Sequence, residues 1–207
     1  MNDPQGEPGY GRTNWRRFAV AVGVPAVVAA GLLIATANGA LAASFSVSGT
    51  QFKLTADALD GTGFTQYSDR DGVMKADGTR LTAVMSGIKS ADITRLCQSV
   101  AAGPVVLRIE AGPDDQHKVH ADDLLIGMSS LAGDATFQDM NIGQDASTLN
   151  ADGADHSQNA GFGQQAKSVY INNLQQKAYS TQASTFVLKG MTLQLFIGDS
   201  SKECFAG

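Results

Sequence analysis

Charged, aromatic and cysteine residues are all scarce in this sequence. Charged side chains make up 17% of the 207 residues, aromatic ones make up 7%, and there are two cysteines. Three of the 15 Lys and Arg and two of the 20 Asp and Glu precede residue 44, which leaves 12 basic and 18 acidic side chains after it. The resulting net charge of about −6 argues against nucleic acid and against an anionic lipid surface as electrostatic partners.

The N-terminal part of the chain has the order of an export signal. An uncharged apolar run spans residues 18–37, and three arginines precede it: Arg12, Arg16 and Arg17. Ala40-Leu41-Ala42 follows the run, in the A-x-A form that signal peptidase accepts. We therefore expect an exported protein, with the residues that follow this segment outside the cytoplasm.

The sequence supports two fates for the export segment. A run of 20 apolar residues is long enough to cross a bilayer as a helix, which favours a retained anchor on the membrane. The alanine-rich composition and the A-x-A form favour cleavage between Ala42 and Ala43 and release as a secreted protein. Three regions are expected, namely a cytoplasmic n-region, a signal peptide or transmembrane anchor, and an extracytoplasmic β-rich domain: 1–17, 18–43 and 44–207.

Cys97 and Cys204 are the two cysteines, and an isolated pair outside the cytoplasm is most simply one disulfide. Such a bridge would join residues 107 apart, which stabilises a fold by about 4 kcal/mol in the loop-entropy treatment. Two independently buried thiols are the alternative. A catalytic thiol is disfavoured because no histidine-rich motif accompanies either cysteine.

Alternating apolar and polar residues predict a domain built mainly of β-strands. The alternation occurs in five segments: 45–54, 105–109, 168–171, 186–188 and 193–195. Glycines between these segments predict turns. Ile93, Leu96 and Val100 differ because they fall at helical spacing, which predicts one short helix from Ser90 to Val100. Ser90 or Asp92 is available as its N-terminal cap.

A weak internal repeat bears on the architecture. Three segments share the order apolar, any residue, Ala or Ile, Asp or Asn, any residue, Leu: Leu54–Leu59, Val119–Leu124 and Val169–Leu174. A strand that turns at the Asp or Asn and then buries the leucine would explain this order. Stacked units of this kind predict a solenoid-like or folded-over β-sheet, preceded by the N-terminal hydrophobic helix. The unequal spacing of the copies fits a β-sandwich equally well.

Six stretches, in order along the chain, resemble one protein family: 39–49, 56–67, 96–100, 133–137, 162–166 and 203–205. The family is actinobacterial, and its exported or membrane-anchored members have no known function, although many carry the automatic label cholesterol esterase. The resemblance implies a location in the cell envelope. It also implies a link to a small multi-span membrane protein, whose gene often lies beside that of the family member. It implies no catalytic or binding residues.

The residues do not support an esterase. A serine hydrolase of the α/β class needs a G-x-S-x-G turn between a strand and a helix, and this motif is absent from the sequence. The nearest segments contain Ser129, without the second glycine, and Ser200, which no histidine follows. The regular alternation of strands and helices that this class requires is missing too. No catalytic residue is therefore predicted.

His117, His120 and Asp122 are the candidate metal ligands, and three more acidic residues accompany them: Asp114, Asp115 and Asp123. On a helix the two histidines would share a face, but the local pattern predicts a strand, where they point to opposite faces. We therefore expect a polar loop entering a strand, with neither a metal nor a cofactor. The acidic segment 150–155 does not have EF-hand spacing and is expected to be an ordinary loop.

These observations predict a non-enzymatic protein of the cell envelope that binds or scaffolds a membrane protein, and the family resemblance implies a multi-span partner. A carrier of lipid or another hydrophobic ligand is the alternative, because a folded-over sheet can enclose an apolar groove. An esterase-type hydrolase ranks third. A continuous inward-facing apolar groove would favour the carrier, whereas a filled core with an exposed apolar patch would favour the binding partner.

Overall fold

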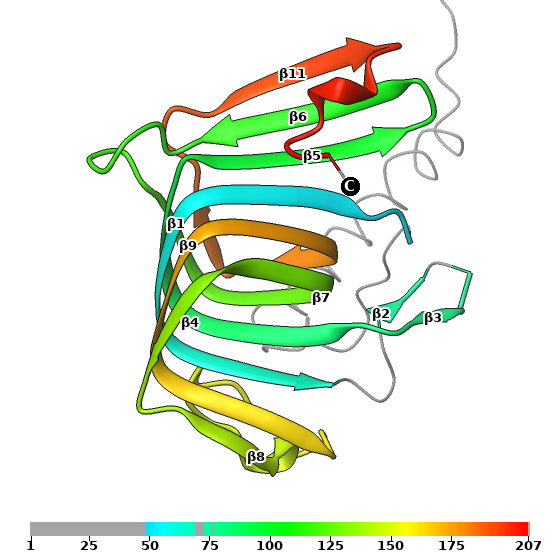
Figure 1. The fold of residues 1–207 in the computed structure, drawn as a ribbon. Coiled ribbons are helices and arrows are strands. Elements are labelled where there is room, and N and C mark those ends of the chain that lie inside the picture. The colour runs from blue at the N-terminus through cyan, green and yellow to red at the C-terminus, as the bar shows by residue number, and fades with distance from the viewer. Residues whose placement is uncertain (1–48, 69–72, 76, 207) are drawn as a thin grey trace, which may run out of the picture. The chain divides into compact units, whose positions relative to one another are not determined.

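A computed structural model describes residues 49–68, 73–75 and 77–206 (Figure 1). These residues belong to the second of the chain's two units, Ser46–Gly207. The n-region, the export segment with its expected hydrophobic helix, and the Ala42–Ala43 cleavage site lie outside the described residues. Within the described ranges, no helix is long and apolar enough to cross a membrane.

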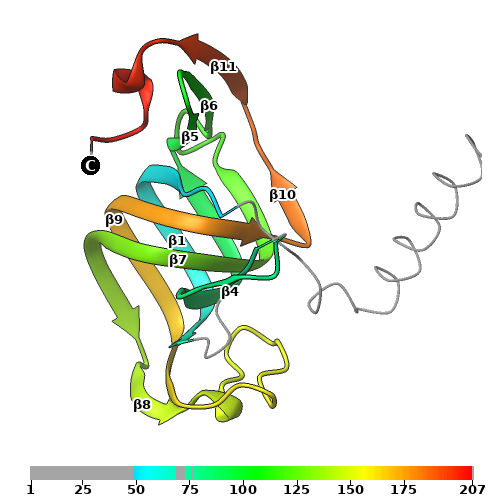
Figure 2. The ribbon, with the colours of Figure 1, turned by 90° about the vertical axis from the view of Figure 1, so that its right-hand side faces the viewer.

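The prediction of a mainly β domain is confirmed. Nine strands form one antiparallel sheet: β1 (Phe52–Ser68), β4 (Val84–Thr94), β5 (Leu96–Ala102), β6 (Val105–Ala111), β7 (Val119–Gln138), β8 (Asn141–Asp145), β9 (Phe162–Gln182), β10 (Thr185–Val187) and β11 (Thr192–Ile197). The order across the sheet is β11-β6-β5-β1-β4-β7-β9-β8, and β10 pairs with β7 (Figure 2). Four short elements complete the described part: strands β2 (Val73–Met74) and β3 (Arg80–Leu81), and 3-10 helices η2 (Ala146–Thr148) and η3 (Ser200–Lys202).

The sheet folds over on itself because its longest strands bend. Strands β1, β7 and β9 contain 17, 20 and 21 residues, and all three curve sharply on the left of Figure 1. In addition to the order above, β1 pairs with β9, so β1, β4, β7 and β9 are paired in a closed cycle. Their inward-facing side chains form the main hydrophobic core, which includes Leu59, Ile88, Val119, Leu124 and Leu174.

The repeated six-residue template marks places where these strands bend. In its second and third copies the fifth residue, Asp123 or Asn173, has a left-handed backbone with φ of 48° or 51°. In β9 the two consecutive residues Asn172 and Asn173 both lie away from the core. The next buried residue after Ile171 is therefore Leu174, three positions later instead of the two positions of a regular strand. The neighbouring strand β1 bends at the same level, because the register places Asn173 opposite Asp57 of the first copy. We call this shared bend the crease.

The predicted helix from Ser90 to Val100 is wrong, because this segment is the end of β4 and the first part of β5. Arg95 joins the two strands with a left-handed backbone, at φ 53°. Ile93 and Leu96 therefore face the same core from successive strands, three residues apart. One face of a helix has the same three-residue step, so the sequence pattern of a bent strand imitates a helix.

Candidate functional site

Strands β5, β6 and β11 extend the sheet beyond its folded part, at the top of Figure 1. The registers place apolar side chains in adjacent rows on one side of this extension, here called the apolar face: Val100, Val105, Leu107, Ile109, Leu193, Leu195 and Ile197. The residues of β11 are the most exposed of these, with Leu193 at 57%, Leu195 at 59% and Ile197 at 75%. Contiguous exposed apolar side chains are typical of interaction sites.

Strand β11 is an edge of the sheet within the described residues. It pairs with β6 on one side, so its other side presents a row of backbone N–H and C=O groups. Its sequence, Thr-Leu-Gln-Leu-Phe-Ile, has neither the charge nor the proline with which edge strands usually avoid other chains. An edge of this kind beside an apolar face suits the addition of a strand from a partner.

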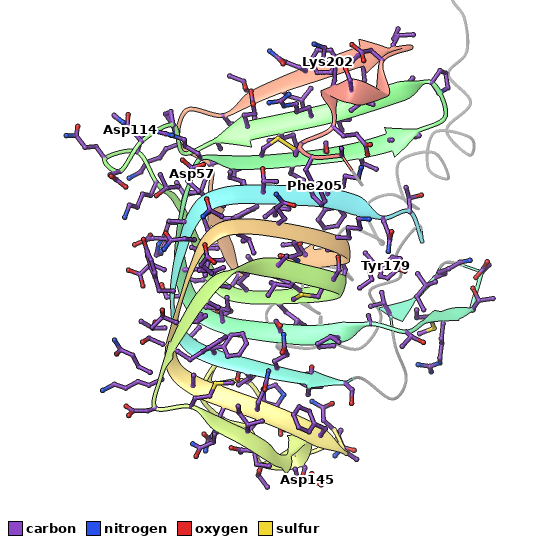
Figure 3. All side chains as sticks on the ribbon, in the orientation of Figure 1. Asp57, Asp114, Asp145, Tyr179, Lys202 and Phe205 are labelled. Atoms are coloured by element: carbon purple, nitrogen blue, oxygen red, sulfur yellow. A yellow bond between two sulfur atoms is a disulfide. The ribbon has the colours of Figure 1, made fainter. Side chains whose placement is uncertain are left out.

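The chain's own C-terminal segment, 198–206, covers the opposite face of the extension. Cys97 and Cys204 lie at disulfide distance, with Cα atoms 5.8 Å apart. The backbone N–H of Cys204 donates to Ser99 Oγ at 2.9 Å, and Lys53 Nζ donates to Glu203 Oε2 at 2.8 Å. Figure 3 shows this segment over β5 and β6, with Lys202 and Phe205 labelled. The covered face is therefore fixed, and the apolar face is the one turned to solvent in the described part of the chain.

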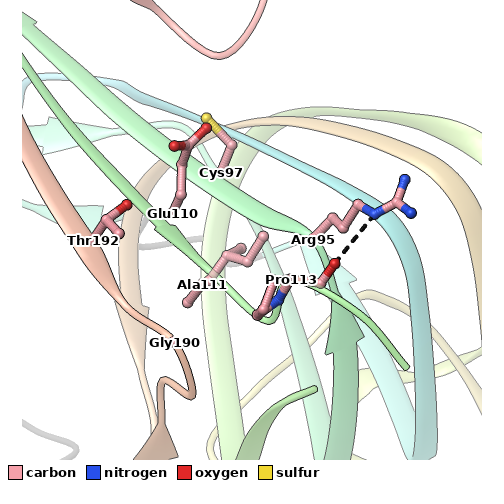
Figure 4. Close-up of a pocket in the computed structure, with 8 residues that line it drawn as sticks. Arg95, Cys97, Glu110, Ala111, Pro113, Gly190 and Thr192 are labelled. Atoms are coloured by element: carbon pink, nitrogen blue, oxygen red, sulfur yellow. Dashed lines mark hydrogen bonds between the residues drawn. The ribbon is translucent and has the colours of Figure 1, made fainter. Parts of the chain in front are cut away.

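A cavity of about 310 Å³ lies where the extension meets the crease (Figure 4). Its lining comes from β5, β6, β11 and the adjoining loops: Arg95, Leu96, Cys97, Glu110, Ala111, Pro113, Gly190 and Thr192. Both charged lining residues already have partners, because Arg95 Nη1 donates to Asp57 at 2.8 Å and Glu110 pairs with Arg108. The described lining does not pair a nucleophile with a base.

The predicted metal candidates separate into two groups. His117 precedes β7, and its Nδ1 lies 2.8 Å from Asp114 Oδ1. His120 lies on β7, with Nδ1 2.8 Å from Asp92 Oδ1 and Nε2 3.3 Å from Asp122 Oδ1. The hydrogen bond with Asp92 is the main cause of the raised pKa of His120. Among the residues that the structure describes, no three His, Cys, Asp or Glu side chains are grouped to hold a metal ion.

The loop before β9 contains a buried polar cluster that sequence reasoning missed. Asp152, expected in an ordinary loop, is 6% exposed, and His156 is 4% exposed. Thr65 Oγ1 donates to Asp152 Oδ2 at 2.7 Å, and His156 Nε2 lies 2.9 Å from Asp152 Oδ1. Asn159 Nδ2 lies 3.0 Å from the other ring nitrogen of His156. The sequence signal was slight, namely an Asp and a His four residues apart between small residues.

This cluster anchors the loop before β9 to strand β1. Burial alone would raise the pKa of Asp152, but hydrogen bonds from His156 and Thr65 outweigh burial and lower the pKa. Both ring nitrogens of His156 already have partners, so the ring has no free nitrogen to take a proton from a substrate. Gly87 leaves room for the carboxylate, because a Cβ there would lie 2.0 Å from Asp152 Oδ2.

Ser129, in the first hydrolase-like segment, has two hydrogen-bond partners. Ser129 Oγ accepts a hydrogen bond from Gln51 Nε2 at 2.7 Å and donates to the carbonyl oxygen of Lys177 at 3.4 Å. Neither contact could activate the hydroxyl as a nucleophile, since neither partner is a base. Ser200 begins the 3-10 helix η3 near the end of the chain.

Two further features escaped sequence reasoning although the sequence carries a signal for each. The alternation at 193–195 predicts strand β11, and the absence of charge from it is the signal for an edge. Gln176 falls at an inward position of β9, between the buried Leu174 and Ala178. A glutamine in an otherwise apolar alternation indicates a polar group inside the core, where it needs a partner.

No curated protein and no solved structure matches this chain. A family model does match, over residues 48–205, which include both cysteines and every strand described above. The description of that family states no activity. The chain therefore belongs to a family of proteins of unknown function, DUF6230.

Proposed function

We propose that this protein is a non-enzymatic component of the cell envelope that binds a membrane protein through β11 and the apolar face. The observation that carries the proposal is an uncharged edge strand whose Leu193, Leu195 and Ile197 side chains are 57–75% exposed. The partner would contribute an extended, apolar-sided segment from its extracytoplasmic part. Backbone hydrogen bonds to the edge would supply affinity, and contacts with the exposed side chains would supply specificity.

Charge and compartment agree with this proposal. The residues after position 43 carry a net charge of about −6, which repels an acidic partner. The apolar face and β11 lack charge, so this repulsion is weakest there. The export segment expected at 18–43 would bring the domain to the outer side of the membrane, either tethered or released. A tethered domain would meet a membrane partner at a high effective concentration.

The geometry supports this function better than the two alternatives. A carrier of whole lipids needs an enclosed pocket of roughly 300–1,000 Å³. The interior of the folded sheet leaves a cavity of about 60 Å³, because core side chains fill the remainder. The cavity of about 310 Å³ where the extension meets the crease is at the lower end of that range, and two charged side chains, Arg95 and Glu110, help to line it. A hydrolase needs a nucleophile beside a base, and Ser129 contacts neither a histidine nor a carboxylate.

The test is photo-crosslinking from position 195 of the full chain in the membranes of the cells that produce it. Position 142 is the matched control, because Ile142 is 68% exposed on β8 but lies away from the apolar face. We expect position 195, and not position 142, to give a covalent product with an integral membrane protein identified by mass spectrometry. Excess unlabelled wild-type chain should abolish this product.

Substitution of the two exposed isoleucines provides the second arm. Ile197→Asp should remove the partner from the purified protein, whereas Ile142→Asp should retain it, since a charge is introduced at similar exposure in both. Equal retention in both variants, or products containing a second copy of this chain alone, would contradict the proposal. Ester hydrolysis by the purified protein that is lost in Ser129→Ala would favour the hydrolase instead.

A further inference from the structure

A small interior cavity lies between the folded halves of the sheet, separate from the apolar face. Its volume is about 60 Å³, and twelve residues from β1, β4, β7 and β9 line it. Nine of the twelve are apolar and none is charged. An ion would lose its hydration there without gaining a counter-charge, so the lining excludes a carboxylate or an ammonium group as an occupant.

One polar atom on the cavity wall lacks a partner. Gln176 lines the cavity from β9 at 1% exposure, and its Nε2 is buried without a hydrogen bond. The other lining amide is satisfied, because Gln66 Nε2 donates to Ser86 Oγ at 2.9 Å and Gln66 Oε1 accepts from Gln164 Nε2 at 2.6 Å. A buried amide donor without a partner is costly, and an acceptor placed in the cavity would remove that cost.

The β7 wall of the cavity is irregular where it crosses β9. The register between the two strands shifts at three places between Gly127 and Asp134. Leu131 lies within this stretch, lines the cavity and is also exposed to solvent, which makes it the entry side. Bulges interrupt the hydrogen-bond ladder and recur beside binding sites for that reason.

We infer that this cavity binds the end of a small neutral ligand that carries a hydrogen-bond acceptor, such as a ketone, ester or alcohol oxygen on a short alkyl group. Gln176 Nε2 donates to that oxygen, and the apolar wall contacts the alkyl part. The volume sets the size of the enclosed group: a cavity of about 150 Å³ holds the six carbons of benzene, so one of about 60 Å³ encloses roughly two to three non-hydrogen atoms. The rest of the ligand lies toward Leu131.

The experiment uses the full chain in lipid nanodiscs, with ¹⁵N NMR of the Gln176 side-chain amide assigned from its loss in Gln176→Leu. The probes are acetone, isobutene and acetate, and each has four non-hydrogen atoms. Acetone is neutral and carries an acceptor oxygen, isobutene is neutral and has no such oxygen, and acetate is negatively charged. Acetone should shift the Gln176 amide resonance saturably. Acetate should leave this resonance unchanged, and isobutene should bind more weakly than acetone.

Two variants separate the hydrogen bond from the fold. Gln176→Leu should weaken acetone binding by about three- to tenfold, the equivalent of one hydrogen bond, and should leave isobutene binding unchanged or stronger. Gln175→Leu is the matched control, since Gln175 is the exposed neighbour on the same strand, and it should leave both affinities unchanged. Retained isobutene binding would show that the cavity persists in the variant.

Two outcomes would overturn the inference. One is a long-lived water bound to the Gln176 amide that acetone cannot displace, because water would then be the occupant. The other is equal acetone affinity in Gln176→Leu and the wild type. Both concern the interior cavity, whereas crosslinking from position 195 concerns β11, so failure of one proposal leaves the other standing.

Discussion

Asp152 connects the loop before β9 to β1 through Thr65, and it also bonds His156 of the same loop. Removing the carboxylate leaves a buried hydroxyl and a buried ring N–H without acceptors. We expect Asp152→Ala to lower the free energy of unfolding by about 3 kcal/mol, measured by urea denaturation. Asp155→Ala is the control, because the exposed Asp155 accepts one backbone hydrogen bond from Ser157 and its removal should lower stability much less. Equal losses in the two variants would contradict the anchoring role.

The Asp152 carboxylate should also make the free energy of unfolding depend on pH. Because the pKa of Asp152 is lower in the folded state, its contribution is complete above the unfolded value of about 3.9 and is lost as the pH falls through the folded value. The stability difference between wild type and Asp152→Ala should therefore shrink as the pH falls below about 4. A difference that stays constant down to pH 2 would show that the folded state does not stabilise the charged carboxylate.

The contribution of His120 to stability should have the opposite pH dependence, because its pKa is raised in the folded state. Its pKa is raised chiefly by the hydrogen bond with Asp92, against a smaller effect of burial, and the charge of Asp122 adds to the increase. A raised pKa gives a stabilising contribution that is complete below the unfolded value of about 6.5 and is lost as the pH rises through the folded value. NMR titration should place the midpoint of His120 above 6.5, and Asp92→Asn should lower it more than Asp122→Asn does. The reverse ranking of the two variants would contradict the assignment to Asp92.

At the scale of the elements, the crease depends on residues that tolerate a left-handed backbone. Asn173 has φ of 51°, a conformation that asparagine and glycine adopt readily and β-branched residues do not. Asn173→Val should lower the free energy of unfolding by about 1–2 kcal/mol, whereas Asn173→Gly should change it little. Asn172→Val is the matched control on the neighbouring residue, which lacks a positive φ, and should be nearly neutral by thermal unfolding. A larger loss in Asn172→Val than in Asn173→Val would rule out backbone conformation as the cause.

The crease also explains which elements the sequence predicted correctly. Regular alternation identified the segments of β6, β9 and β11, since one face of each strand differs from the other along most of its length. The template requires Asp or Asn as its fourth residue, so it does not identify a further copy at Ala91–Leu96, where Thr94 stands at that position. This hidden copy produced the wrong helix. The Asp152 cluster could not be predicted either, because its loop has no periodicity and its partner Thr65 lies 87 residues away.

At the scale of the whole molecule, pairings between distant segments hold the sheet together. The first strand, β1, pairs with β9, more than one hundred residues later, and also with β4 and β5. The local sequence pattern cannot predict which strands pair, because several strands have the same alternation and each could occupy the same place in the sheet. The extension of β5, β6 and β11 joins the folded part through β1, and the C-terminal segment covers one of its faces. Anything that releases that segment should therefore affect the extension first.

The bridge between Cys97 and Cys204 allows a test of this dependence. It closes a loop of 107 residues, so the double variant Cys97→Ala, Cys204→Ala should lose about 4–5 kcal/mol of stability. Hydrogen exchange followed by mass spectrometry should show the earliest loss of protection in 198–206 and β11, with β1 and β9 protected longer, because the closed cycle of strands does not contain the bridge. Wild-type protein treated with a reductant should reproduce this order, which controls for the substitutions. Simultaneous loss of protection in β1 and β11 would show instead that the bridge supports the whole fold, and two reactive thiols in the native protein would show that the bridge is absent.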